Sequence, residues 1–129
     1  MIDRKALIFY FVKKTREKFP REWRAKLAHF RICVEENHIR YGNPPSAKRL
    51  MGYCIASKHT IVYYNPPLPI NWYVADVYEI LRGIESIVEH ELLHGVGMGE
   101  EMIAQYKQDR QKFIKDKVLE KYWESISTK

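Results

Sequence analysis

Residues 88–101 carry the densest chemical pattern in the chain and read Val88-Glu89-His90-Glu91-Leu92-Leu93-His94-Gly95-Val96-Gly97-Met98-Gly99-Glu100-Glu101. Successive residues of a helix are about 100° apart, so His90 and His94 lie one turn apart on the same face. Their imidazoles can therefore reach a single metal ion. Glu91 lies about 100° round from His90, beside such an ion, where a general base can take a proton from metal-bound water.

The pattern ends a long predicted helix that begins at Ile70 or Asn71 and runs to about Val96. Its apolar residues recur at helical spacing and share one sector: Val77, Ile80, Leu81, Ile84, Ile87 and Val88. A polar set projects away from that sector and is expected to face solvent: Glu79, Arg82, Glu85, Ser86 and Glu89. His90 and His94 fall at the margin of the apolar sector, which predicts half-buried side chains facing a cleft.

The remaining sequence predicts a single domain, residues 1–129, of the α+β class. The expected elements are helices over Asp3–Lys18 and Arg21–Lys26, a strand over His29–Glu35, a hairpin of Met51–Ser57 with Thr60–Asn65, and a last helix from Glu100 to about Ile126. We expect a small mixed or antiparallel sheet of about three strands. It should pack against the long histidine-bearing helix and a C-terminal helix, with an N-terminal helix completing the fold.

Composition narrows the class of protein further. With 46% hydrophobic residues the chain can bury a core, and Cys33 and Cys54, its only cysteines, are expected to be free thiols. No segment approaches the roughly 20 apolar residues of a membrane span, so we expect no membrane partner and a cytoplasmic location. The net charge of +6 is concentrated in residues 1–50, where thirteen Lys and Arg face five Asp and Glu.

A catalytic metal needs a third protein ligand and an open position for water. No histidine or cysteine follows His94, so a downstream ligand must be a carboxylate. Three glycines within residues 95–99 break the helix and permit the chain to reverse. The reversal can deliver either Glu100 or Glu101 to the two histidines.

His-Glu-x-x-His is the zinc-binding signature of the zincin metallopeptidases. The spacing His-x-x-Gly-x-x-Glu puts Glu100 where metzincins carry their third ligand, although those enzymes use His or Asp. Glu101-Met102-Ile103-Ala104 resembles the Glu-x-x-Ala of the gluzincin glutamate helix, and the chain as a whole resembles the minigluzincins over roughly residues 30–126. This resemblance favours Glu101 as third ligand and keeps Glu100 as the alternative. The connection from His94 to Glu101 is very short for a gluzincin.

The resemblance implies a zinc metalloendopeptidase with one Zn²⁺ per chain, which hydrolyses peptide bonds through zinc-activated water with Glu91 as general base. A peptide or unfolded protein would lie along the free edge of the strand Thr60–Asn65. Tyr64 or Tyr106 can assist by stabilising the oxyanion. The resemblance also implies self-inhibition, by residues 121–129 of the chain's own tail or by formation of a homo-oligomer.

A second interpretation belongs to another class of protein. The basic residues of the N-terminal third, among them Lys13, Lys14 and Arg16, fit a nucleic-acid- or protein-binding module. The zinc site would then be structural or silent. A third interpretation is a chance occurrence of the motif in an unrelated α+β domain.

Overall fold

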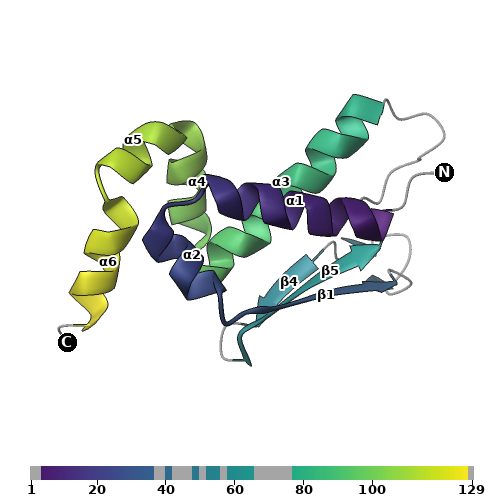
Figure 1. Ribbon diagram of the computed structural model, residues 1–129, viewed down its shortest axis with the longest axis horizontal. Helices are drawn as coiled ribbons and strands as arrows, with labels where there is room; N and C mark the ends of the chain where they lie inside the picture. Colours follow the sequence, from purple (N-terminus) through teal and green to yellow (C-terminus); the bar gives the residue numbers. More distant parts are fainter. Residues whose placement is uncertain are drawn as a thin grey trace.

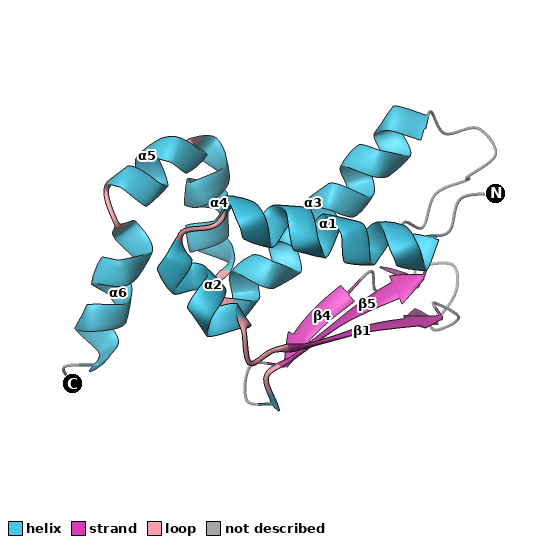
Figure 2. Ribbon diagram, viewed as in Figure 1, coloured by secondary structure: helices cyan, strands magenta, loops and turns pink. Residues whose placement is uncertain are grey.

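The computed structural model describes residues 4–36, 40–41, 48–49, 52–55, 58–65 and 77–127. The described elements are α1 (Arg4–Lys18), α2 (Arg21–Leu27), β1 (Arg31–Glu36), β2 (Arg40–Tyr41), β3 (Lys48–Arg49), β4 (Gly52–Ile55), β5 (Thr60–Asn65), α3 (Val77–Gly95), α4 (Glu100–Gln108), α5 (Arg110–Lys115) and α6 (Val118–Ser127). Helices and a small mixed sheet form separate parts of the fold (Figure 1, Figure 2). The predicted α+β class is confirmed.

The main sheet has the strand order β1-β5-β4. Strands β4 and β5 form the predicted hairpin, antiparallel, with Gly52 opposite Tyr63, and its turn holds His59 at a positive φ of 48°. Strand β1 pairs with β5 in parallel, so that Arg31 lies opposite Thr60. Strands β2 and β3 make a separate antiparallel pair.

The expectation that Thr60–Asn65 has a free edge is wrong. This strand, β5, is the central one and is hydrogen-bonded on both sides. The reason is the parallel pairing with β1, which joins segments far apart in the chain and leaves no mark in the local alternation of residues. Among the described strands, the free edges of this sheet belong to β1 and β4.

Helices α1 and α3 cover one face of the sheet and pack on each other (Figure 2). Helix α1 buries a stripe at helical spacing that consists of Ile8, Phe11, Val12 and Thr15. Helix α3 buries Ile84, Val88 and Leu92 in the same core. The hydroxyl of Tyr63 on β5 donates a 2.8 Å hydrogen bond to the carbonyl of Val88, which fixes the helix over the sheet.

The predicted ends of these elements agree with the structure to within a few residues wherever they fall on described residues. The predicted ends at Asp3, Met51 and Ser57 lie outside the described residues. Helix α3 ends at Gly95, close to the predicted Val96. Its predicted start, at Ile70 or Asn71, lies outside the described residues. Among the described helices none is long and apolar enough to cross a membrane. Cys33 on β1 and Cys54 on β4 are free, and both are half-buried.

The single last helix predicted from Glu100 to about Ile126 is wrong, because the chain forms α4, α5 and α6 in its place. Asp109 adopts an extended backbone, and its side chain accepts a 3.1 Å hydrogen bond from the amide of Lys112, which starts α5. Lys117, which has a positive φ of 53°, lies between α5 and α6. The short Asp109 side chain accepts the amide hydrogen of Lys112 and so competes with the backbone carbonyls that a continuous helix would use.

Trp23 of α2 joins these three helices. Its ring is fully buried and lies against Phe19, Tyr106 and Phe113 at centroid distances of 5.3, 5.5 and 6.1 Å. Its Nε1 donates a 2.7 Å hydrogen bond to Oε1 of Glu120 on α6, while Oε2 of Glu120 is buried without a hydrogen-bond partner. Helix α2 is thereby tied to α4, α5 and α6 through one side chain.

We predict that Trp23→Phe lowers the free energy of unfolding by about 2–3 kcal/mol, because a smaller ring leaves a cavity and Glu120 loses its donor. Urea denaturation measures this loss. Glu120→Gln is the matched control, since it keeps an acceptor for Trp23 and removes the buried charge, and it should cost less. A loss in Trp23→Phe of less than about 0.5 kcal/mol would contradict the central role of this side chain.

Candidate metal centre

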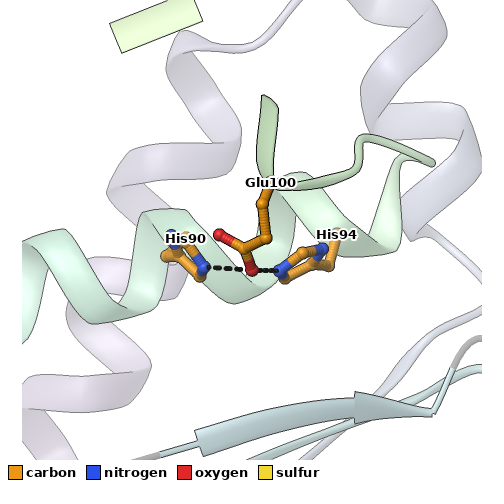
Figure 3. A group of neighbouring side chains, drawn as sticks. All are labelled: His90, His94 and Glu100. Atoms are coloured by element: carbon orange, nitrogen blue, oxygen red, sulfur yellow. Dashed lines mark hydrogen bonds and ion pairs between the residues drawn. The ribbon is translucent and has the colours of Figure 1, made fainter. Parts of the chain in front are cut away.

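Helices α3 and α4 bring His90, His94 and Glu100 together (Figure 3). One carboxylate oxygen, Oε1 of Glu100, lies 3.1 Å from Nε2 of His90 and 2.7 Å from Nε2 of His94. The ligand atoms of the three residues all lie within 4.8 Å of one another. This group can hold a metal ion.

The two histidines come from successive turns of α3, as the sequence predicts. Their rings stand edge to face, 4.9 Å apart between centroids. Their side chains are 31% and 25% exposed, which confirms the predicted half-buried position at the margin of the apolar sector. Glu100 is 70% exposed, so the group opens to solvent.

Glu100 reaches the histidines because the chain reverses sharply after α3. The amide of Gly97 donates to the carbonyl of His94 at 3.0 Å, and the amide of Met98 donates to the carbonyl of Leu93 at 3.1 Å. These two bonds, with Gly97 at a φ of 103°, form a Schellman motif, in which glycine is favoured because a side chain is strained at positive φ. Helix α4 then begins at Glu100.

His94 is oriented by a backbone contact of the same turn. Its Nδ1 lies 2.9 Å from the carbonyl oxygen of Met98, which can only accept, so Nδ1 carries a hydrogen. A neutral His94 then has its lone pair on Nε2, directed at Glu100. A second hydrogen bond of this kind is the usual way in which proteins fix a histidine that binds metal.

The donor set fits a metal cation. A lone pair on His94 Nε2 would repel the Glu100 carboxylate at 2.7 Å unless a proton or a cation lies between them. Partial burial works against ionisation of Glu100, but its hydrogen bonds to His90 and His94 and their charge outweigh burial and lower its pKa. Two imidazole nitrogens and one carboxylate oxygen are a combination found around zinc and other divalent transition metals.

The structure brings Glu100, the alternative third ligand, to the histidines. Glu101, the favoured one, is exposed and is not among the three residues whose ligand atoms converge. The choice depends on the first turn of α4: consecutive helical residues point about 100° apart, so only one of the two carboxylates can face α3.

Glu91 lies beside the metal group and toward the sheet. Burial raises its pKa, while the charges of His90 and His94 work to lower it and that of Glu100 to raise it. Burial and the nearby Glu91 carboxylate raise the pKa of Cys54 on β4 to about 11. The same two causes, burial first, raise the pKa of Tyr63 on β5. Glu91 therefore lies between α3 and strands β4 and β5.

Of the two tyrosines proposed as oxyanion stabilisers, the structure describes the side chain of Tyr106 alone, and it lies in an aromatic cluster. Tyr106 is buried between Trp23 and Phe113, with the guanidinium of Arg110 at 5.4 Å from its ring centre, and this supports a packing role. Tyr64 lies in β5, and its side chain is outside the described part of the structure. Its role stays a prediction.

Trp123 of α6 is a residue of the site that the sequence analysis overlooked. Its Nε1 donates a 3.0 Å hydrogen bond to the carbonyl of Val96, inside the turn that carries Glu100. A Cβ atom added at Gly97 would lie 3.2 Å from the same nitrogen, and Lys26 covers the ring at 4.7 Å. The sequence signal was a Trp among the apolar positions of the last helix, which indicates packing without identifying the partner.

Comparisons with protein-family models, with curated proteins and with solved structures found no match for this chain. The resemblance to the minigluzincins stays a prediction. Inference about function therefore begins from His90, Glu91, His94 and Glu100.

We predict that Glu100→Gln weakens zinc binding by about 10-fold or more, because the amide lacks the negative charge with which the Glu100 carboxylate attracts the ion. Glu101→Gln is the matched control, since it makes the same change one residue away. Competition with a chromophoric chelator measures both affinities. If Glu101→Gln released zinc more readily, Glu101 would be the ligand.

We predict that Trp123→Phe weakens zinc binding by about three- to tenfold. Loss of a partner in direct contact with a ligand typically costs about 10–100-fold, and Trp123 acts one contact further out, through the turn. Lys121→Gln, an exposed substitution on the same helix, should leave the affinity unchanged. Equal affinities for Trp123→Phe and the wild type, in folded protein, would show that α6 does not position the turn.

Proposed function

We propose that the protein is a zinc metallopeptidase in which His90, His94 and Glu100 hold one Zn²⁺ and Glu91 is the general base. One observation carries this proposal: a single carboxylate oxygen lies between the two Nε2 atoms of a His-Glu-x-x-His helix. When bound, zinc polarises a carbonyl oxygen and lowers the pKa of a coordinated water to about 7.

The chain's own residues supply the remaining functions. His90 and His94 bind as neutral imidazoles, and the Met98 carbonyl keeps the lone pair of His94 on Nε2. Glu91 follows His90 on the helix and lies beside the group, where its carboxylate can accept a proton and pass it to the leaving amine. Partial burial keeps that carboxylate partly out of bulk water and raises its pKa.

An extended peptide is the substrate class that the surroundings favour. The ligands are partly exposed, so a polymeric substrate can reach them. Strand β4 lies beside Glu91, as the effect of that carboxylate on Cys54 indicates, and its outer edge has no partner among the described strands. A peptide backbone can add to this edge by hydrogen bonding. Strand β4 thus takes the place that the sequence analysis gave to Thr60–Asn65.

Self-inhibition by the chain's own tail stays a prediction. Most of residues 121–129 form the end of α6, and Tyr122 lines a cavity of about 460 Å³ together with Glu100 and Glu101. Deleting the tail would also remove Trp123 and disturb the turn before Glu100. Substitution of Tyr122 is therefore the cleaner way to look for inhibition.

The test of the proposed function is cleavage of unfolded casein by zinc-loaded protein. We predict that Glu91→Gln lowers the rate by about 10²–10⁴-fold, because the amide cannot accept a proton, and that it still binds one zinc per chain. Glu101→Gln should keep the activity, and chelation followed by added zinc should remove and restore it. Zinc-loaded wild type that cleaves nothing, or Glu91→Gln with full activity, would contradict the proposal.

A further inference from the structure

On the polar face of α3, Arg82, Glu85 and Ser86 are exposed, as the sequence predicts, whereas Glu89 is half-buried. Arg82, Glu85, Ser86 and Glu89 line a cavity of about 590 Å³ that residues of α1, α4 and α5 complete. Cavities of about 300–1,000 Å³ are typical of small-molecule sites. On a helix of about 100° per residue, Arg82, Glu85 and Glu89 point roughly 80–180° away from His90 and His94. None of His90, His94 and Glu100 lines the cavity, so the cavity is separate from the metal group.

One ion pair in the cavity is already satisfied. Arg110 of α5 donates two hydrogen bonds to Glu89, at 3.1 Å from Nε and 2.6 Å from Nη2. Only 14% of the Glu89 side chain is exposed. This two-pronged contact fixes Arg110 and neutralises Glu89.

Three other cations line the cavity, each from a different helix: Lys18 of α1, Arg82 of α3 and Lys107 of α4. Within the described part of the chain none of them has an ion-pair partner. The one further acidic residue in the lining is Glu85. Counting described residues alone, three cations and one acid in the lining have no ion-pair partner, and such a surplus of positive charge attracts anions.

The floor of the cavity is apolar with a few hydrogen-bonding groups. Phe19 and Tyr106 are buried there, and so is Thr15. Burial and the Glu89 carboxylate raise the pKa of Tyr106 to about 12, although Arg110 works to lower it. Its hydroxyl is therefore protonated at neutral pH and can donate. A cationic rim over an aromatic floor suits a molecule with an anionic head and an apolar body.

We propose that this cavity binds a phosphate monoester with an aromatic or apolar body, its phosphate held by Lys18, Arg82 and Lys107. A phosphate monoester carries a charge of about −1.5 to −2 at pH 7, which matches the surplus of cations. Arginine and lysine are the side chains that bind phosphate most often. The proposal is independent of the metallopeptidase proposal, since no metal ligand takes part.

Calorimetric titration of the zinc-loaded protein with phenyl phosphate tests it. We expect Arg82→Gln to weaken binding by about tenfold or more, through loss of a charge-assisted hydrogen bond. Glu85→Gln should tighten binding about two- to fivefold, because it removes the unpaired acid. Lys115→Gln, which removes an exposed cation outside the cavity, is the matched control and should change nothing. Phenol should not bind, and inorganic phosphate should bind more weakly than phenyl phosphate.

Each alternative outcome overturns the proposal. If phenyl phosphate binds Arg82→Gln as tightly as it binds the wild type, and if chelation of the metal abolishes this binding, then the phosphate binds to the metal and not to the cavity. If Lys115→Gln weakened binding as much as Arg82→Gln, the attraction would be non-specific and due to the basic surface. If phenyl phosphate did not bind at all, the cavity would not be a site for phosphate monoesters. A thermal melt checks the fold: Arg82 is exposed and has no ion-pair partner among the described residues, so Arg82→Gln should leave the melting temperature almost unchanged.

Discussion

Two backbone hydrogen bonds at the end of α3, from Gly97 to His94 and from Met98 to Leu93, turn the chain back on itself. Gly97 permits this turn because its φ of 103° is strained for residues with a side chain. The turn starts α4 at Glu100 and leaves the Met98 carbonyl facing His94. One backbone reversal therefore sets both the position of the Glu100 carboxylate and the orientation of His94.

The remainder of the C-terminal region supports that reversal. Trp123 of α6 donates a hydrogen bond to the Val96 carbonyl. Trp23 of α2 donates one to Glu120, which also lies on α6. Helices α2 and α6 thus support the turn through side-chain hydrogen bonds, and α3 supports it through backbone hydrogen bonds. An exposed group of side chains that can hold a metal ion is kept in place in this way without being buried.

Helix α3 gives each of its faces a different environment. Val88 and Leu92 are in the core, Glu91 faces strands β4 and β5, and the two histidines face Glu100. The polar face, with Arg82 and Glu89, lines the cavity beneath α1, α4 and α5. Arg82 and Glu85 on this face are exposed, as on a solvated helix, yet they also line this cavity. Lys18, Arg82 and Lys107 come from three helices to one cavity, and their combined positive charge attracts an anion.

Local geometry made much of this protein predictable from its residues. The spacing of His90 and His94 puts both on one face of any helix, and the alternation around residues 57–59 marks the hairpin of β4 and β5. Three features did not follow from residue patterns: the first depends on pairing between distant segments, and the other two depend on the backbone conformation at single residues. The parallel pairing of β1 made β5 a central strand, the backbone of Asp109 and Lys117 divided the last helix, and the Schellman turn directed Glu100 to the histidines in preference to Glu101. Residues 100 and 101 are equivalent as chemistry, and only the direction in which α4 leaves the turn makes them different.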